Sequence, residues 1–214
     1  MSIHDLRRAA DELSAAERKE LIRIYREDAE TRRIAQASAE ANSSIQTRVE
    51  DVIKLAEAMD ANRLGIATCV GLLGESRTLT KILRKRGFDV FGVCCKVAGT
   101  KKNCVGITDE QLAGFKTGPI MCNPIMQAKL LNEAGTDLNI VMGLCVGHDS
   151  LFLKYAKAPC VSLVIKDRVL GNNPAAALYT TSSFYSKLLE PQTTPSAVEF
   201  MQRRNAEKEE LKNG

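Results

Sequence analysis

Cysteine is the residue type in this chain most able to do chemistry, because its thiolate binds soft metals and attacks electrophilic sulfur. The sequence has 7 cysteines, and four of them recur at nearly even intervals: Cys69, Cys95, Cys122 and Cys145. One strand–helix unit with its return strand takes roughly 30 residues, so each of these thiols occupies a similar place in successive units. Four thiolates that meet at one point suit zinc or an iron–sulfur cluster. We therefore predict a metal centre, either an iron–sulfur cluster or zinc, with these four ligands.

A metal-free enzyme of thiol redox or sulfur-transfer chemistry is the alternative. No C-x-x-C pair is present, and that spacing is what makes a metal motif specific. The adjacent thiols of Cys94 and Cys95 suit such an enzyme, with Cys94, Lys96 and His148 as its candidate catalytic residues. Lys96 neutralises negative charge, and His148, one of only 2 histidines, is an acid, a base or a ligand. The alternative for each single cysteine is a purely structural one, in which it is buried in the core as a small apolar side chain.

A second alternative is a non-catalytic module that binds or senses an anionic ligand. Asn123 and Asn173 each precede a proline, which is typical of an N-cap followed by proline at the first helical position, and Asp149 is a third predicted cap. Helix N-termini bind anions, so these three residues are candidate cofactor-binding residues. Their competing interpretation is a purely structural cap.

Short apolar runs alternate with helical patterns through the middle of the chain. The predicted strands are 64–70, 88–95, 138–145 and 161–166, and helices are expected to begin near 75, 123, 149 and 173. This alternation predicts an α/β fold, a Rossmann-like and mostly parallel sheet flanked by helices. Parallel strands bring their carboxyl ends to one edge, where ligands bind, so the four evenly spaced thiols are predicted to meet there. A P-loop, a G-x-G-x-x-G turn and a serine nucleophile elbow are all absent from the sequence.

The remaining cysteines are expected to lie outside this site. Cys160 begins the fourth predicted strand, so it should lie at the opposite edge of the sheet and serve packing. Cys104 follows two lysines in a loop and is expected to be incidental.

Three regions are predicted along the chain. Residues 1–60 form a helical extension, with one helix over 5–40, a break and cap at 42–44, and a second helix from Val49. Residues 61–190 form the α/β core with the cysteine cluster, and residues 191–214 form a charged helical tail. The N-terminal helices suit internal packing or a homodimer.

The composition is that of an ordinary globular protein, with 44% hydrophobic and 26% charged residues in 214. The net charge of +4 is small and its charges are interleaved, so no nucleic-acid partner is predicted. The apolar runs are strand-sized and the first residues lack the apolar stretch of a secretory signal, so neither a membrane span nor export is predicted. We expect a cytoplasmic protein, with reduced or metal-bound thiols and a small molecule or a metal as its ligand.

Six motifs together resemble a prokaryotic family of unknown function. They are Thr68-Cys69-Val70-Gly71-Leu72, Val93-Cys94-Cys95-Lys96-Val97, Met121-Cys122-Asn123-Pro124, the run from Asn132 to Val141, Gly143-Leu144-Cys145-Val146-Gly147-His148-Asp149, and Lys166-Asp167-Arg168-Val169-Leu170-Gly171. The resemblance covers roughly Arg48 to Tyr179, and members of the family are commonly described as uncharacterised metal-binding proteins. They tend to carry a cysteine-rich N-terminal segment, whereas residues 1–60 contain no cysteine here. The resemblance thus implies metal binding only if that property depends on the four evenly spaced thiols, and it implies no particular reaction.

Overall fold

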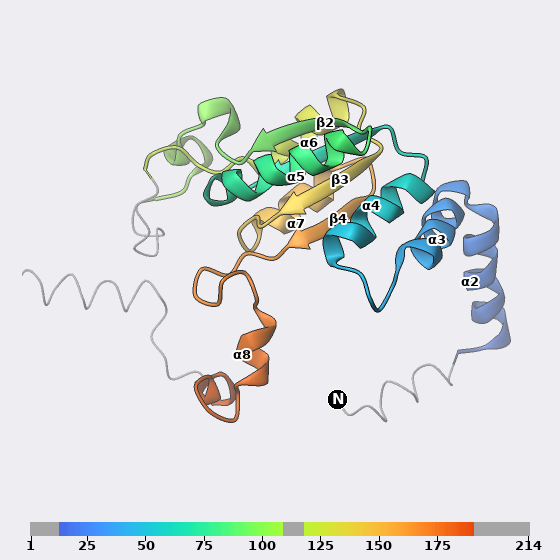
Figure 1. Ribbon diagram of the computed structural model, residues 1–214. Coiled ribbons are helices and arrows are strands. Elements are labelled where there is room, and N and C mark those ends of the chain that lie inside the picture. Colours follow the sequence, from blue (N-terminus) through green and yellow to red (C-terminus); the bar gives the residue numbers. More distant parts are fainter. Residues whose placement is uncertain (1–12, 109–117, 191–214) are drawn as a thin grey trace, which may run out of the picture. The chain divides into compact units, whose positions relative to one another are not determined.

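A four-stranded parallel sheet flanked by helices is the centre of the computed structural model, which describes residues 13–108 and 118–190 (Figure 1). The predicted α/β class is therefore confirmed. The chain divides into two compact units, Met1–Ala61 and Asn62–Gly214. The elements in order are α2 (Ala15–Glu27), α3 (Ala29–Ala41), α4 (Arg48–Ala58), β1 (Arg63–Thr68), η1 (Val70–Leu72), α5 (Leu73–Lys85), β2 (Asp89–Cys94), η2 (Val97–Gly99), η3 (Lys102–Val105), α6 (Pro124–Glu133), β3 (Leu138–Met142), α7 (His148–Tyr155), β4 (Cys160–Val164), α8 (Ala175–Tyr179) and η4 (Ser186–Leu189).

The described part of the first unit consists of helices α2, α3 and α4. The single helix predicted over 5–40 is wrong within the described residues, because Asp28 separates α2 from α3. Its side chain accepts a hydrogen bond from the Thr31 amide at 2.7 Å and caps α3. The predicted break after α3 is present, but the cap is Thr47, in a capping box with Glu50. Residues 5–12 of the predicted helix lie outside the described residues.

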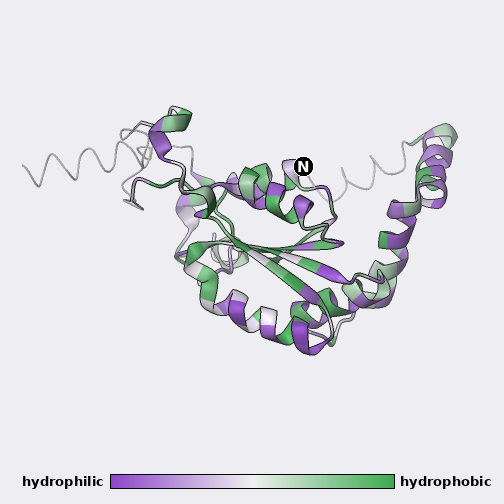
Figure 2. Cartoon of the chain, turned by 90° about the horizontal axis from the view of Figure 1, so that it is seen from above, coloured by the Kyte–Doolittle hydropathy of each residue, from purple (hydrophilic) through white to green (hydrophobic). Residues whose placement is uncertain are grey.

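The sheet has the strand order β2-β1-β3-β4, and all neighbouring strands are parallel. The connection from β1 to β2 runs toward one side and that from β3 to β4 toward the other, so the winding reverses between β1 and β3. With right-handed crossovers, α5 covers one face while α6 and α7 cover the other, and Figure 2 shows helices on both faces of the sheet. In such sheets, ligands bind at the carboxyl ends of the strands where the winding reverses.

The core of this unit is apolar and closely packed around β1 and β3. Every residue of β3 is buried, as are the side chains of Leu64, Leu131 and Phe152. Burying side chains of this size contributes about 1.5–3 kcal/mol each to folding. A Cβ atom added at Gly65 in β1 would lie 2.1 Å from Oδ1 of Asn139 in β3, so only glycine permits this close approach.

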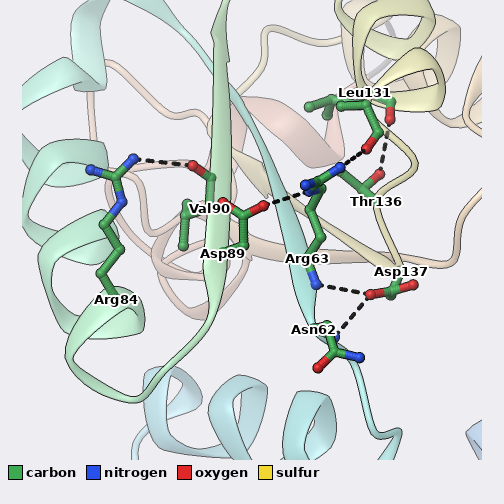
Figure 3. Close-up of polar contacts among 9 residues, drawn as sticks. Asn62, Arg63, Arg84, Asp89, Val90, Leu131, Thr136 and Asp137 are labelled. Atoms are coloured by element: carbon green, nitrogen blue, oxygen red, sulfur yellow. Dashed lines mark hydrogen bonds and ion pairs between the residues drawn. The ribbon is translucent and has the colours of Figure 1, made fainter.

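Polar contacts fix the amino ends of the strands, as Figure 3 shows. The Nε of Arg63 donates to the Asp89 carboxylate at 2.6 Å, and its Nη1 donates to the carbonyl of Ala134 at 2.6 Å. The Asp137 carboxylate accepts the backbone amides of Asn62 and Arg63 at 2.9 and 2.8 Å. The Arg63–Asp89 pair is exposed and so adds little stability, but together these contacts tie the start of β1 to the start of β2 and to the segment before β3.

The third strand ends earlier than predicted. β3 stops at Met142 because Gly143 adopts a φ of 59°, which turns the chain out of the sheet. Cys145 therefore follows the strand at a distance of three residues instead of closing it.

Two predicted helix caps are wrong. Gly147, with a φ of 83°, occupies the N-cap position of α7, so Asp149 lies within the first turn and accepts the Ser150 amide at 2.8 Å. Helix α8 has Pro174 at its N-cap position, with no side-chain cap, so Asn173 is not the cap predicted for this helix.

No helix in the described ranges combines the length and apolar character that a membrane crossing requires. The predicted helical tail, residues 191–214, lies outside the described residues.

Candidate functional site

The carboxyl ends of β1 and β2 position the first two thiols of the site. The amide of Cys69, directly after β1, donates to the carbonyl of Met142 at 3.1 Å, and the amide of Cys95, directly after β2, donates to the carbonyl of Thr68 at 2.9 Å. These bonds extend the ladders one residue beyond the strands. Both cysteines are consequently fixed at the same edge of adjacent strands, as the sequence predicts.

The start of α6 brings the third thiol to that edge. The amide of Asn123 donates to the carbonyl of Cys95 at 2.7 Å, which holds Cys122 beside Cys95. Asn123 is also the predicted cap, because its Oδ1 accepts the amide of Met126 at 3.0 Å. Asn123 thus has a structural role in the described part of the chain, and no ligand contact is assigned to it.

A buried glutamine ties α6 to the two strands. The Nε2 of Gln127 donates to the carbonyls of Thr68 at 3.1 Å and Val93 at 2.7 Å, and its side chain is fully buried. Each carbonyl lies close in sequence to a site cysteine. Gln127 therefore fixes the helix that carries Cys122 against the strands that carry the other two thiols.

Three thiols form a hydrogen-bonded series, in which Cys69 donates to Cys95 and Cys95 donates to Cys122. Its hydrogen bond to Cys95, together with burial, raises the pKa of Cys69 to about 12. Donation to Cys122 likewise raises the pKa of Cys95. Accepting that bond lowers the pKa of Cys122 to about 7, with a further contribution from the charge of Lys96. The negative charge of the series therefore settles on Cys122.

Accessibility follows the same order. Cys69 and Cys95 are only 6% and 2% exposed, whereas Cys122 and Cys145 are half-buried. The most acidic thiol of the series thus belongs to the least buried of its three residues.

Backbone amides of the loop after β1 point at the two buried sulfurs. The amide of Val70 donates to the Sγ of Cys95 at 3.3 Å, and a backbone hydrogen bond from Gly71 lowers the pKa of Cys69. Successive amides of this kind stabilise negative charge.

The fourth thiol belongs to the same site through its electrostatics. The charge of Cys145 raises the pKa of Cys122, so the two sulfurs lie within range of each other. The Nη2 of Arg168 donates to the Sγ of Cys145 at 3.1 Å. The structure thus brings all four evenly spaced cysteines to one region, with three of them hydrogen-bonded in series.

His148 also lies at this edge. Burial is the main cause of its lowered pKa, and the charges of Asp149, Cys69, Lys96 and Arg168 act on it. The imidazole is therefore neutral near pH 7 and can accept a proton.

Other predicted residues lie apart from the thiol series. Cys94 is half-buried and is not a hydrogen-bond partner of Cys69, Cys95 or Cys122 among the described residues. No contact between Asn173 and these thiols is found in the described part of the chain.

The two cysteines expected to lie outside the site, Cys160 and Cys104, are found apart from the thiol series. Cys160 begins β4, at the far edge of the sheet, and its thiol donates to the carbonyl of Ala158 at 3.3 Å. Cys104 is exposed in η3.

Sequence reasoning missed Lys166, Arg168 and Gln127 as parts of this site. The two cations follow β4, so their place after a strand was an available signal. Gln127 gave no signal beyond being a polar residue on the buried side of a helix.

The described side chains do not form a preorganised metal site. Among residues 13–108 and 118–190, no group of three or more His, Cys, Asp or Glu side chains is placed so that it could hold a metal ion. All seven cysteines are free thiols. What the arrangement offers chemically is a partly exposed thiolate with a thiol donor behind it and cations beside it.

Comparisons with known proteins place the chain in a family without assigning a reaction. The sequence profile of the family described as "Protein of unknown function (DUF1847)" matches residues 9–163, which is more than half of the chain. This match begins well before Arg48, so the likeness also includes the N-terminal helices. An uncharacterized protein of Methanocaldococcus jannaschii is 45% identical over 175 residues, which cover 80% of this chain and 88% of that protein. The chain therefore belongs to the DUF1847 family of proteins of unknown function.

Proposed function

We propose that the chain is a thiol enzyme of the redox or sulfur-transfer type, in which Cys122 is the attacking sulfur and Cys95 is its partner thiol. The observation that carries the proposal is the hydrogen-bonded series from Cys69 through Cys95 to Cys122. The series ends at the one of its three sulfurs that is not buried. A nucleophilic thiol needs this combination of access and a stabilised thiolate.

The reaction with a disulfide illustrates the chemistry. The Cys122 thiolate attacks one substrate sulfur, forms a mixed disulfide and releases the first substrate thiolate, which takes the proton of Cys95. The Cys95 thiolate then attacks the Cys122 sulfur and expels the second substrate thiolate. Two electrons pass from the protein dithiol to the substrate, and a Cys95–Cys122 disulfide forms.

Peptide mapping of the reduced, full-length protein after reaction with a neutral aromatic disulfide tests the proposal. We expect a Cys95–Cys122 disulfide in the wild type, none in Cys122→Ser, and an unchanged yield in Cys104→Ser, which removes an exposed thiol outside the series. Equal modification of all accessible thiols, or an unchanged reaction in Cys122→Ser, would overturn it.

Metal binding by the same four thiols is the second candidate function. The observation that favours it is the meeting of Cys69, Cys95, Cys122 and Cys145 from four separate elements, since zinc and iron–sulfur clusters are commonly held by four cysteines. Zinc–sulfur bonds of about 2.3 Å put the sulfurs of a tetrahedral site roughly 3.8 Å apart, a separation typical of thiols in hydrogen-bonding reach. Holding an ion would require these side chains to rearrange, since no group of three or more His, Cys, Asp or Glu side chains among the described residues is placed to hold one.

Metal quantitation and visible absorption of protein purified without oxygen separate the two candidates. Stoichiometric zinc or iron that is lost in Cys122→Ser but retained in Cys104→Ser would favour the metal centre. Protein without stoichiometric metal that forms the Cys95–Cys122 disulfide would favour thiol chemistry.

A further inference from the structure

Three cations stand around the hydrogen-bonded thiols, from the segments that follow β2 and β4. The charge of Lys96 acts on Cys122 and His148, and that of Lys166 acts on Cys69. The guanidinium of Arg168 donates to the Cys145 sulfur at 3.1 Å and also acts on His148. Positive charge therefore approaches every sulfur of the site except Cys95.

Two carboxylates close to this region, those of Asp149 and Asp167, accept hydrogen bonds from backbone amides. The charge of Asp149 acts on His148, while its Oδ1 accepts the Ser150 amide. Asp167 is held by its own loop, because its Oδ1 accepts the amides of Val169 and Leu170 at 2.9 and 2.8 Å. Within the described ranges, no carboxylate lies at salt-bridge distance from Lys96 or Lys166.

Gly71 lies next to both one cation and one sulfur of the site. A Cβ atom at Gly71 would lie 3.7 Å from the Nζ of Lys166 and 4.0 Å from the Sγ of Cys69, in contact with both. Its φ is not positive, so backbone conformation does not require glycine here. The Lys166 ammonium group and the Cys69 sulfur therefore approach the same backbone position, which places this cation beside a thiol of the site.

A substrate that uses the whole site must carry both an electrophilic sulfur and negative charge. A neutral disulfide would use the thiolate but not the positive charge beside it, whereas phosphate would use the positive charge and leave the thiolate without a role. A thiolate and a dianion repel each other, and cations at this range offset that repulsion.

We propose, on the basis of the function proposed above, that the substrate is a small anionic sulfane-sulfur compound of the thiosulfate type, whose outer sulfur is transferred to Cys122. The Cys122 thiolate attacks that sulfur, the sulfur–sulfur bond of thiosulfate breaks, and its electron pair leaves with sulfite. Thiosulfate and the protein thiolate thus become sulfite and a Cys122 persulfide anion, with atoms and charge balanced and no other reactant. Cys95 donates its hydrogen bond to the Cys122 side chain before and after transfer, and Lys96, Lys166 and Arg168 hold the charge of the oxyanion.

Single-turnover reaction of the reduced, full-length protein with thiosulfate tests this assignment. We expect release of one sulfite per protein and a mass increase of one sulfur atom on the peptide with Cys122. Lys166→Met and Lys96→Met should each slow the transfer about tenfold. Lys129→Met, which removes the same charge from an exposed pair with Glu133 on α6, should not slow it. The rate of sulfur transfer to the wild-type protein should also fall as the salt concentration rises. This test can be made without any substitution.

Comparison of two alkylating agents gives a readout that does not depend on turnover. Iodoacetate should modify Cys122 faster relative to iodoacetamide in the wild type than in Lys166→Met. If a neutral disulfide oxidises Cys122 but thiosulfate leaves no sulfur on it, the substrate assignment fails and the thiol-enzyme proposal stands. If neither reagent reacts with Cys122, both fail.

Discussion

The backbone amide of Asn123 lies 2.7 Å from the carbonyl oxygen of Cys95 and donates a hydrogen bond to it. The two residues belong to different elements, one to the end of β2 and the other to the cap of α6. This bond holds Cys122 beside Cys95, and the side-chain hydrogen bond between their sulfurs depends on it. The proton state of the accessible thiol is therefore governed by backbone geometry.

Removing the Cys95 donor should raise the pKa of Cys122. The hydrogen bond from Cys95 is the largest contribution that lowers that pKa to about 7, so Cys95→Ala should return it toward the ordinary value of about 8.5. The pH dependence of iodoacetamide alkylation of Cys122 measures this. Cys95→Ser keeps a donor and should show a smaller shift, and equal curves for wild type and Cys95→Ala would contradict the hydrogen-bonded series.

Replacing Gln127 by methionine should destabilise the protein and loosen the site. The carbonyl of Val93 loses its Gln127 donor and that of Thr68 loses one of its donors, at a cost of about 1–3 kcal/mol in the free energy of unfolding. Urea denaturation measures the loss, and the alkylation profile of Cys122 should shift to higher pH at the same time. Lys129→Met on the exposed side of α6 is the control, with a change within about 0.5 kcal/mol. A stability change of that small size in Gln127→Met would show that the buried amide does not fix α6.

The stability of the protein should fall in mild acid because of His148. Burial lowers its pKa in the folded state below the ordinary value of about 6.5, so the unfolded chain takes up this proton first. Stability contributed by the neutral imidazole is present above about pH 6.5 and is lost as the pH falls through the folded pKa. Urea midpoints between about pH 7 and about pH 5 should decrease more in the wild type than in His148→Gln. Parallel decreases in the two proteins would assign the acid sensitivity to other groups.

Gly65→Ala should be one of the most damaging single substitutions in the sheet. Its Cβ would lie 2.1 Å from the Asn139 Oδ1 and 3.0 Å from the Leu131 side chain, so β1 and β3 must separate, at about 1–3 kcal/mol or more. Gly74→Ala in α5 meets nothing within 4 Å and should be neutral or stabilising by up to about 1 kcal/mol. Thermal denaturation of both variants measures the contrast, and similar melting temperatures for the two would contradict the close approach of β1 and β3.

The sheet and the edge that gathers the thiols are predictable from the sequence. Apolar runs that alternate with helices predict strands that run in the same direction. Parallel strands then bring Cys69 and Cys95 to one edge of the sheet. The early end of β3 is not predictable in this way, because Gly143 and the apolar run beyond it read like a continuing strand. The break at Asp28 is likewise hidden in a sequence of strong helix formers.

The proton order among the thiols and the cations beside them require coordinates. The place of Cys122 beside Cys95 depends on the hydrogen bond from the Asn123 amide to the Cys95 carbonyl, which the spacing of residues does not predict. Lys166 and Arg168 resemble any solvated lysine and arginine after a strand until β4 is known to lie beside β3. The caps expected from Asp149 and Asn173 fail for a related reason, since Gly147 and Pro174 take those positions.

The proposed site is assembled from residues that lie far apart along the chain. Its four cysteines, Cys69, Cys95, Cys122 and Cys145, come from four different elements. A nascent, partly folded or heat-damaged chain accordingly presents four separate cysteines of ordinary acidity. The acidic, cation-flanked thiolate arises only when β1, β2, α6 and the loop after β3 are all in position. If Cys122 is the reactive thiol that we propose, its reactivity should report on whether these four elements have come together, and it should be lost when they separate.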